Sequence, residues 1–476
     1  MLYRSVTANC SGRDTAKILQ LTSHSNNAYQ VENMKREAFI KIVSFLRHAI
    51  EGTEFNGHVF AVGGCVRDMV LESDNIKDID IVIDIENGGI RLANFFYEKG
   101  LLLREPVVYE RFSTSMFVLK EFMDVPLEAV HTRSEQYPDP NSRNPVQDFG
   151  PLEEDCMRRD LTINALYLDI TTGNVLDLTG KGKADIKYKI IRTPRNPMDT
   201  YNDDPLRMLR CIRFATRYNW HIDGNTYDAI KDMGHRLSII PKERIHDELE
   251  KIFKSDNWFT GLDLLYKTGI YQHILRGDTF VSFASPMLTN IIDRHDIMSS
   301  VMSKVNTDMR HVMIMALMGA NPNSLKELKF SNKEIEFHKK CLYELGYLHK
   351  YITLPTQTNL KRLMFELDDF KYGSLMMLLA IVPDEYLIFT KELVNIISDA
   401  DASTEPSLLH MDTLPIDGND IMDIFNIEPS PHVKTLMDAC ADYIITSLAP
   451  KDITRENCLS LLKQANEQTI LTHLFQ

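Results

Sequence analysis

The sequence predicts an α/β head followed by an all-helical remainder. Two apolar runs, HVFAVGG at residues 58–64 and DIDIVID at residues 78–84, have the length and composition of buried strands. The run MKREAFIKIVSFLRHAI, residues 34–50, has apolar residues at helical spacing. Beyond Asp203 the strand-like runs stop, and segments such as PLRMLRCIRFATRY and KERIHDELEKIF have the spacing of successive helices. This order of elements is typical of an α/β domain joined to all-α domains.

The 476 residues are predicted to comprise five parts. These are an N-terminal extension (1–35), the head (36–190), a helical neck (191–265), a helical body (266–365) and a helical tail (366–476). Within the head, VPLEAV at residues 125–130 is a further candidate strand. The stretch EQYPDPNSRNPVQDFG, residues 135–150, is rich in Pro, Asn and Asp and is predicted to be a loop.

Composition narrows the class of protein. The chain is 44% hydrophobic and 25% charged, which is ordinary for a globular protein, and no apolar run is long enough to span a membrane. The net charge of −14 means that any nucleic-acid surface must concentrate its basic residues on one face. Seven scattered cysteines without a CxxC pair predict reduced, mostly buried thiols in a reducing compartment, and the expected location is cytoplasmic. Residues 1–20 weakly resemble a mitochondrial targeting segment, and we interpret them as a polar extension.

Two aspartates stand one residue apart in the second strand-like run. In a strand, residues i and i+2 face the same side, so Asp78 and Asp80 should project together. Two close carboxylates repel unless a cation lies between them, and Mg²⁺ prefers oxygen ligands of this kind. The pair therefore suggests a magnesium site, and the alternative is an exposed strand end with solvated aspartates.

A glycine pair precedes these aspartates. Gly63 and Gly64 lie between the first predicted strand and the predicted helix CVRDMVLE, where backbone N–H groups can bind an anion. Arg67, in the first turn of that helix, can reach the same phosphates. The alternative is an ordinary tight turn. A phosphate-binding turn and metal-binding carboxylates in one short unit are more specific together than either is alone.

Four motifs follow one another along the chain. GGCVRD with KDIDIVI comes first, and EEDCMRRDLTINAL (153–166), DDPLRMLRCIRFA (203–215) and KERIHDELEKIF (242–253) follow. Together they resemble the class II CCA-adding tRNA nucleotidyltransferase and poly(A) polymerase family, within the DNA polymerase beta-like nucleotidyltransferase superfamily. Asp203 stands where the family usually has Glu. The resemblance implies a head with a mixed sheet and flanking helices, followed by an all-α neck, body and tail, with tRNA bound by the tail.

The resemblance also implies the activity and the site. The expected reaction is template-independent addition of CCA to tRNA 3′ ends from CTP and ATP, with release of pyrophosphate, by a two-metal mechanism with Mg²⁺ as cofactor. The implied catalytic residues are Asp78, Asp80 and Glu128, of which Asp78 and Asp80 are also the metal ligands. The implied nucleotide-binding residues are Gly63, Gly64, Arg67, Arg158, Arg159, Asp160, Asn164, Asp204, Arg207, Arg210 and Arg213.

Individual roles follow from the same resemblance. The arginines of the second motif would bind the triphosphate, Asp160 and Asn164 the ribose, and Asp204 with Arg207 the base. Arg207, Arg210 and Arg213 are spaced by three, which forms one stripe on a helix. The alternative for that stripe is a basic face packed against acidic neighbours.

Other functions remain open at this point. One alternative is a poly(A) polymerase or an enzyme that adds only part of CCA; the last residues, LKQANEQTILTHLFQ, lack the basic tail of bacterial poly(A) polymerases, which favours CCA addition. Another is a non-catalytic tRNA-binding homologue, against which both aspartates argue. RHDIM, residues 294–298, has no companion metal ligands, so no metal-dependent hydrolase activity is expected. The oligomeric state is not indicated.

Overall fold

The computed structural model describes residues 34–76, 78–138, 145–275, 293–305, 308–318, 320–352, 379–380, 414–448 and 452–467. They belong to two compact units, of which the first comprises residues up to Arg207 and Trp220–Ala229. The second comprises Met208–Asn219 and the residues from Ile230 onward. Nearly all of the predicted N-terminal extension and much of the predicted tail lie outside the described residues.

The first unit contains the predicted head. Its strands are β1 Met34–Lys35, β2 Val59–Val62, β3 Asn75–Ile76, β4 Ile79–Ile83, β5 Val107–Tyr109, β6 Thr114–Val118, β7 Pro126–His131, β8 Arg133–Gln136, β9 Val146–Phe149, β10 Tyr167–Asp169, β11 Val175–Leu176, β12 Ile190–Ile191 and β13 His221–Ile222. Its helices are α3 Arg36–Ile50, α4 Gly64–Val70, α5 Gly88–Glu98, α6 Leu152–Met157, α7 Gly182–Tyr188 and α8 Pro197–Asp203, with the 3₁₀ turns η1 Glu110–Phe112 and η2 Thr162–Asn164.

A seven-stranded mixed sheet forms the centre of this unit, in the order β11-β10-β2-β4-β7-β6-β5. The pairing of β4 with β7 is parallel, and the other pairings in the sheet are antiparallel. The predicted α/β head with a mixed sheet and flanking helices is therefore confirmed. The three predicted strands correspond to β2, β4 and β7, and the predicted helix of residues 34–50 corresponds to α3.

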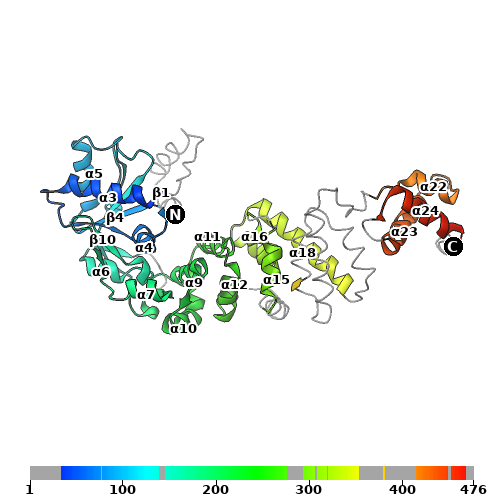
Figure 1. Ribbon diagram of the computed structural model, residues 1–476. Coiled ribbons are helices and arrows are strands. Elements are labelled where there is room, and N and C mark those ends of the chain that lie inside the picture. The colour runs from blue at the N-terminus through cyan, green and yellow to red at the C-terminus, as the bar shows by residue number, and fades with distance from the viewer. Residues whose placement is uncertain are drawn as a thin grey trace. The chain divides into compact units, whose positions relative to one another are not determined.

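The two faces of the sheet carry different layers. Ile79, Ile81 and Ile83 of β4 are buried in the larger core with α3 and α5, to which Phe39 and Phe96 contribute. The intervening positions of β4 face the other side, where Val82 packs in a smaller core with Leu152 and Cys156 of α6. Figure 1 shows α3 and α5 on one side of the strands and α6 on the other. Strand alternation therefore directs Asp80 to the α6 side, away from the larger core.

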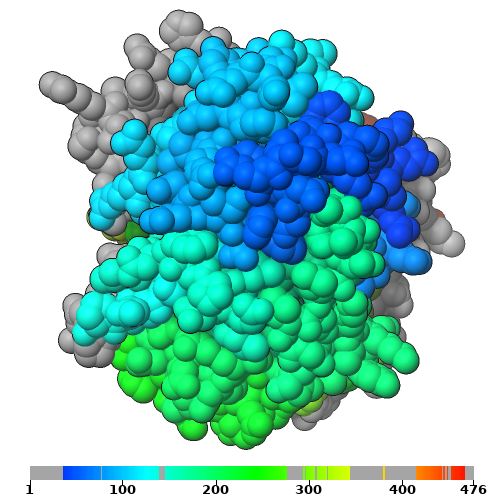
Figure 2. Space-filling view, turned by 90° about the vertical axis from the view of Figure 1, so that its left-hand side faces the viewer, coloured from blue at the N-terminus to red at the C-terminus, as the bar shows by residue number. Residues whose placement is uncertain are grey.

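The helix α3 lies at the surface of the first unit, which accounts for its polar residues. Figure 2 shows this helix, in dark blue, lying exposed on the surface of the first unit. Arg47, near its end, donates from Nε to the carbonyl oxygen of Ile170 at 2.9 Å, which ties the helix to the end of β10. The apolar face of α3 is buried while Glu37, Lys41 and His48 are exposed, as amphipathic spacing predicts.

The predicted loop at residues 135–150 is wrong in part. Its two ends form β8 and β9, an antiparallel pair in which Glu135 is opposite Gln147. The composition of the connection is that of a turn, but the flanking polar residues pair their backbones and their side chains. Arg133 donates to the Gln147 side chain at 3.0 Å, so cross-strand polar contacts replace the apolar alternation on which strand prediction relies.

The second unit is helical in its described residues, as predicted for the remainder of the chain, although the short parallel pair of β12 and β13 extends into the predicted helical neck. The helix α9 Leu206–Tyr218 and the helix α10 Gly224–Met233 each include residues of both units. The second unit continues with η3 Gly234–Ile239, α11 Lys242–Phe253, α12 Trp258–Lys267, α13 Tyr271–Ile274, α15 His295–Met302, α16 Arg310–Leu317, α17 Pro322–Glu327, α18 Asn332–Ile352, α22 Gly418–Phe425, α23 His432–Ser447 and α24 Arg455–Glu467.

Close packing holds these helices together. A Cβ atom on Gly261 of α12 would lie 2.3 Å from Ile252 and 2.8 Å from Thr216, so glycine is required where α12 meets α9 and α11.

The last three helices, α22, α23 and α24, share a core of their own that includes Ile421, Ile444 and Leu462, and Figure 1 shows them gathered near the C-terminus. Within the described residues no helix combines the length and apolar character needed to cross a bilayer.

Candidate active site

Three carboxylates meet on the α6 side of the central sheet. Asp80 of β4 is directly opposite Glu128 of the parallel neighbour β7, and both side chains are half-buried. Asp78 is exposed and immediately precedes β4, so of the predicted pair only Asp80 lies within the strand. The register of this parallel pairing places Asp80 beside Glu128, and Asp78, just outside the strand, is near enough to raise the pKa of both.

The pKa values reflect this crowding. Burial, followed by the repulsion from Glu128 and, more weakly, from Asp78, raises the pKa of Asp80 to about 7, although Arg159 acts in the opposite direction. Burial also raises the pKa of Glu128, against the attraction of Arg133. Carboxylates this close repel one another when they are ionised. A divalent cation bound between their oxygen atoms would relieve that repulsion.

The glycine turn adjoins these carboxylates. Gly63 has a φ of +78°, which glycine adopts without strain, and it follows β2, the antiparallel neighbour of β4. A Cβ atom at Gly63 would lie 3.5 Å from Asp80 Oδ2 and 3.8 Å from Arg159 Nη1. Gly64 begins α4. The predicted phosphate turn, one predicted metal ligand and one predicted triphosphate-binding arginine are therefore neighbours.

A buried polar chain links α4 to the second motif. Arg67 is only 4% exposed and donates from Nε to Asp68 at 2.8 Å and from Nη1 to the Asn164 side chain at 2.6 Å. Asn164 in turn donates to Asp160 Oδ1 at 3.1 Å. The predicted ribose-binding residues thus lie side by side, and Asn164 is in a 3₁₀ turn rather than in an α-helix.

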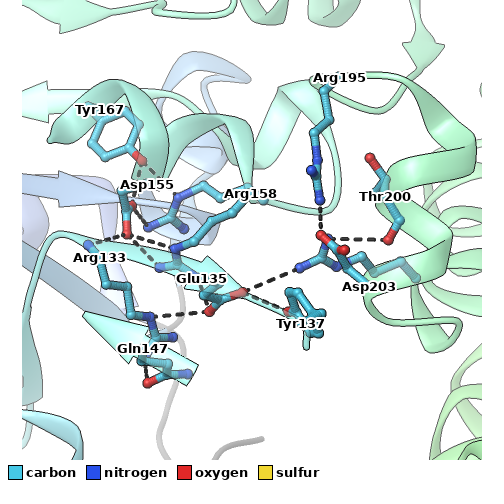
Figure 3. A network of polar contacts seen from close by, with 12 residues as sticks. Arg133, Glu135, Tyr137, Gln147, Asp155, Arg158, Tyr167, Arg195, Thr200 and Asp203 are labelled. Atoms are coloured by element: carbon cyan, nitrogen blue, oxygen red, sulfur yellow. Dashed lines mark hydrogen bonds and ion pairs between the residues drawn. The ribbon is translucent and has the colours of Figure 1, made fainter. Parts of the chain in front are cut away.

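Asp155, which was not predicted, organises the two arginines that follow it. Its Oδ1 accepts from Arg158 Nε at 3.1 Å and Nη2 at 2.5 Å. Its Oδ2 accepts from Arg159 Nη2 at 2.9 Å and from the Tyr167 hydroxyl at 2.6 Å. Figure 3 shows Asp155 between Arg158 and Tyr167. Burial alone would raise the pKa of Asp155, but the two arginines outweigh it and hold that pKa well below its usual range.

Glu135 of β8 extends this network toward the base-reading motif. It accepts from Arg158 Nη1 at 2.9 Å and from the Tyr137 hydroxyl at 2.8 Å, and Arg207 Nη2 lies 3.9 Å from its Oε2. Burial alone would raise the pKa of Glu135, but Arg158 and Arg133 outweigh it and keep that pKa below its usual value. The hairpin that was predicted as a loop therefore carries a charged residue between two motifs (Figure 3).

The base-reading motif begins just before α9. Asp204 accepts a hydrogen bond from the backbone N–H of Leu206 at 3.1 Å, at the start of that helix. Arg207 is 8% exposed and donates to the carbonyl oxygen of Thr200 at 3.3 Å. Asp203, the residue that departs from the family pattern, forms an ion pair with Arg195. Both predicted base-reading side chains are thus held by local contacts at the α8–α9 junction.

The other two arginines of the stripe belong to the second unit. Arg213 forms an ion pair with the buried Glu248 of α11 at 2.7 Å and lies over the Phe214 ring at 4.3 Å. Arg210 lies over the same ring at 5.9 Å. For Arg213, this ion pair fits the alternative interpretation of the arginine stripe, in which a basic helix face packs against an acidic neighbour.

A sequence signal existed for one of the residues that was missed. Asp155 precedes Arg158 and Arg159 by three and four residues, the spacings at which side chains meet on one helical turn, so a helix prediction there would have paired them. Glu135 and Tyr167 carried no such signal, because Arg158, Arg159 and Asp155, with which they interact, belong to other elements.

Comparisons with known proteins identify sequences and folds that are similar to this chain. Residues 59–192 match the model of the poly A polymerase head domain, and residues 219–277 match the probable RNA and SrmB-binding site of polymerase A. The chain is 34% identical over 226 residues to the tRNA nucleotidyltransferase cca1 of Schizosaccharomyces pombe, covering 44% of each chain. It is 35% identical over 223 residues to the mitochondrial CCA tRNA nucleotidyltransferase of Candida glabrata, covering 43% of this chain and 41% of that one.

The match covers only part of these relatives, since the chain spans about half the length of the curated relatives it matches. Among solved structures, the Thermotoga maritima CCA-adding enzyme complexed with tRNA has a TM-score of 0.62 at 18% identity, over 92% of this chain and 98% of that one. This likeness shows that the two share a fold. Over residues 59–192 and 219–277, the chain is therefore similar to the class II CCA-adding tRNA nucleotidyltransferase and poly(A) polymerase family that its motifs resemble.

Proposed function

We propose that the protein adds CCA to tRNA 3′ ends from CTP and ATP without a nucleic-acid template. The observation that carries the proposal is the register of β4 with β7, which places Asp80 opposite Glu128 beside the Gly63 turn and Arg159. The names of the relatives, tRNA nucleotidyltransferase and CCA tRNA nucleotidyltransferase, support the same reaction for this chain.

Asp78 and Asp80 would hold Mg²⁺, and Glu128 completes the charge around it. These residues fit Mg²⁺ because they offer the hard oxygen ligands that this ion prefers. The raised pKa of Asp80 also indicates that neighbouring positive charges do not fully neutralise the carboxylates. When bound, the cation supplies Lewis-acid activation of the attacking hydroxyl and neutralisation of the leaving pyrophosphate.

The remaining chemistry belongs to the side chains of the protein. The 3′ oxygen of the RNA forms a bond to the α-phosphorus, the bond to pyrophosphate breaks, and Glu128 accepts the hydroxyl proton. Arg159, held by Asp155 beside Gly63, is positioned to bind the triphosphate as a fork donor, and Arg158 is held by the same carboxylate. Asp160 with Asn164 would accept and donate hydrogen bonds to the ribose.

Base choice is assigned to Asp204 and Arg207. Cytosine and adenine each present an amino donor beside a ring acceptor, which matches a carboxylate that accepts and a guanidinium that donates. Uracil and guanine present a carbonyl where the other two bases present the amino group, so that carbonyl would meet the carboxylate unfavourably. These two side chains therefore replace a template strand in the proposal.

The wider assignments are part of the same proposal. The neck (191–265) would carry base recognition, and the tail (366–476) would bind tRNA, in keeping with the five-part division of the chain. For the compartment we propose the cytoplasm, with the mitochondrion as the alternative suggested by the name of the Candida glabrata relative. Fractionation of cells that express the tagged full chain distinguishes the two.

The test offers a tRNA without its 3′ CCA together with all four nucleoside triphosphates. Products extended by C, C and A support the proposal, whereas an A-tail, a partial addition or no extension would each replace it with one of the alternatives. Asp80→Ala should abolish incorporation of both CMP and AMP, because the metal ligand is lost. Asp74→Ala, which removes an exposed carboxylate from the preceding loop, is the matched control and should retain activity.

A further inference from the structure

A second group of metal-ligating side chains lies in the second unit, apart from the carboxylates of the head. It consists of His246 on α11, His311 on α16 and Glu334 on α18. One potential ligand atom from each residue lies within 4.8 Å of the other two. Three helices that are well separated in the sequence therefore converge on one point with two imidazoles and a carboxylate.

The orientation of His246 is suited to a ligand. Its Nδ1 lies 3.1 Å from the carbonyl oxygen of Leu328. Because a carbonyl oxygen can only accept, Nδ1 must carry the proton, and the lone pair is then on Nε2. Metal-binding histidines typically donate their other ring N–H to a backbone carbonyl or carboxylate in this way, which fixes both the tautomer and the ring plane.

The carboxylate is held in place by a helix cap. Glu334 Oε2 accepts from the backbone N–H of Ser331 at 2.7 Å, and Ser331 Oγ accepts from the backbone N–H of Glu334 at 3.3 Å. This reciprocal pair is a capping box at the start of α18. It leaves Oε1 directed at His311, whose Nε2 lies 2.8 Å away.

The surroundings exclude water from two sides of the group. His311 is only 1% exposed and is therefore almost completely shielded from solvent. Phe330 stacks on His246 at 4.0 Å and on His311 at 5.8 Å between ring centroids. A hydrogen bond between His311 and Glu334 would explain why those two side chains are close. It does not explain why a ligand atom of His246 lies within 4.8 Å of both.

We propose that His246, His311 and Glu334 form a zinc site that fastens α11, α16 and α18 to one another. Two imidazole nitrogens and one carboxylate oxygen suit Zn²⁺, whereas Mg²⁺ prefers oxygen ligands throughout. Three protein ligands leave the fourth tetrahedral position for water. The site is separate from the catalytic carboxylates, and its role is to stabilise the helical unit.

Zinc titration of the chelator-treated full chain, followed by calorimetry in excess Mg²⁺, tests the proposal. The expected result is one zinc ion bound per chain, with a higher melting temperature. Glu334→Gln keeps an acceptor for the capping box but removes the carboxylate charge, and His246→Gln removes an imidazole that is only half-buried. Each should weaken zinc binding by more than about 100-fold, since even changes to residues behind the ligands cost 10- to 100-fold.

His48→Gln is the matched control, because it removes an exposed histidine of α3 in the other unit and should leave zinc binding unchanged. Cobalt provides an independent readout, since its visible absorption reports tetrahedral coordination in the wild-type chain and should be absent from Glu334→Gln. Circular dichroism confirms that each variant is folded. The proposal is overturned if the wild-type chain binds no stoichiometric zinc, or if the folded His246 and Glu334 variants bind it as tightly as the control.

Discussion

Replacing Asp155 with asparagine should uncouple the two arginines of the second motif while changing the shape of the site very little. The carboxylate is completely buried and accepts from Arg158, Arg159 and Tyr167. Asparagine offers only one acceptor oxygen. If that oxygen stays with Arg158, the new amide NH₂ lies against Arg159 Nη2, donor against donor.

The structure sets the size of the effect. Removing one partner of a buried ion pair typically costs about 3–5 kcal/mol, because the remaining charge stays buried without compensation. The free energy of unfolding should fall by about this amount in Asp155→Asn. Arg159 also lies beside Gly63 and Asp80, so its release should weaken triphosphate binding. A lost charge-assisted hydrogen bond is worth about 1.5–3 kcal/mol, or a fall of roughly 10- to 100-fold in kcat/KM for both CTP and ATP.

Urea unfolding and steady-state nucleotide incorporation measure the two effects separately. Glu154→Gln is the matched control, since it makes the same chemical change at an exposed position of α6 and should alter stability by less than about 0.5 kcal/mol. The reasoning is refuted if Asp155→Asn unfolds within about 1 kcal/mol of the wild type and retains its kcat/KM. If only the stability or only kcat/KM is unchanged, Arg158 and Arg159 have other sufficient partners for that property.

Three further predictions concern the neighbouring residues. Arg207→Ala should reduce discrimination against UTP and GTP by roughly 10- to 100-fold, more than it slows incorporation of CTP, because one charged hydrogen bond to the base is lost; unchanged nucleotide choice in a four-nucleotide assay would count against it. Arg213→Ala should destabilise the protein by up to about 3–5 kcal/mol, because the buried Glu248 loses its partner at 2.7 Å and keeps only Lys251 at 3.9 Å, and denaturant titration checks this. In the presence of a chelator, the free energy of unfolding should decrease as the pH rises from about 4 to about 7. Burial and Glu128 raise the pKa of Asp80 in the folded chain to about 7. Over this pH range the unfolded chain has already released the Asp80 proton that the folded chain retains, so a rising pH favours unfolding. Asp80→Asn should flatten that slope, and a slope that persists in this variant would contradict the assignment.

Part of the site was predictable because its signals are local. Strand alternation indicated that Asp80 would leave the apolar core, and the Gly63–Gly64 turn lies where a strand and a helix meet, as the sequence pattern indicated. Residues a few positions apart on one strand or helix share a face whatever the rest of the chain does. For the same reason the helices α3 and α11 were predicted close to their observed bounds.

Tertiary structure alone decided the remainder. That Glu128 lies opposite Asp80 depends on which strands pair and in which register, and β4 and β7 are separated by 42 residues between Ile83 and Pro126. Glu135 joins Arg158 and Arg207 only because the hairpin of β8 and β9 packs against α6. The convergence of His246, His311 and Glu334 likewise depends on helix packing. Periodicity determines which face of an element a residue occupies, but the partner of that face is chosen by burial and charge summed over the whole fold, which no short stretch of sequence contains.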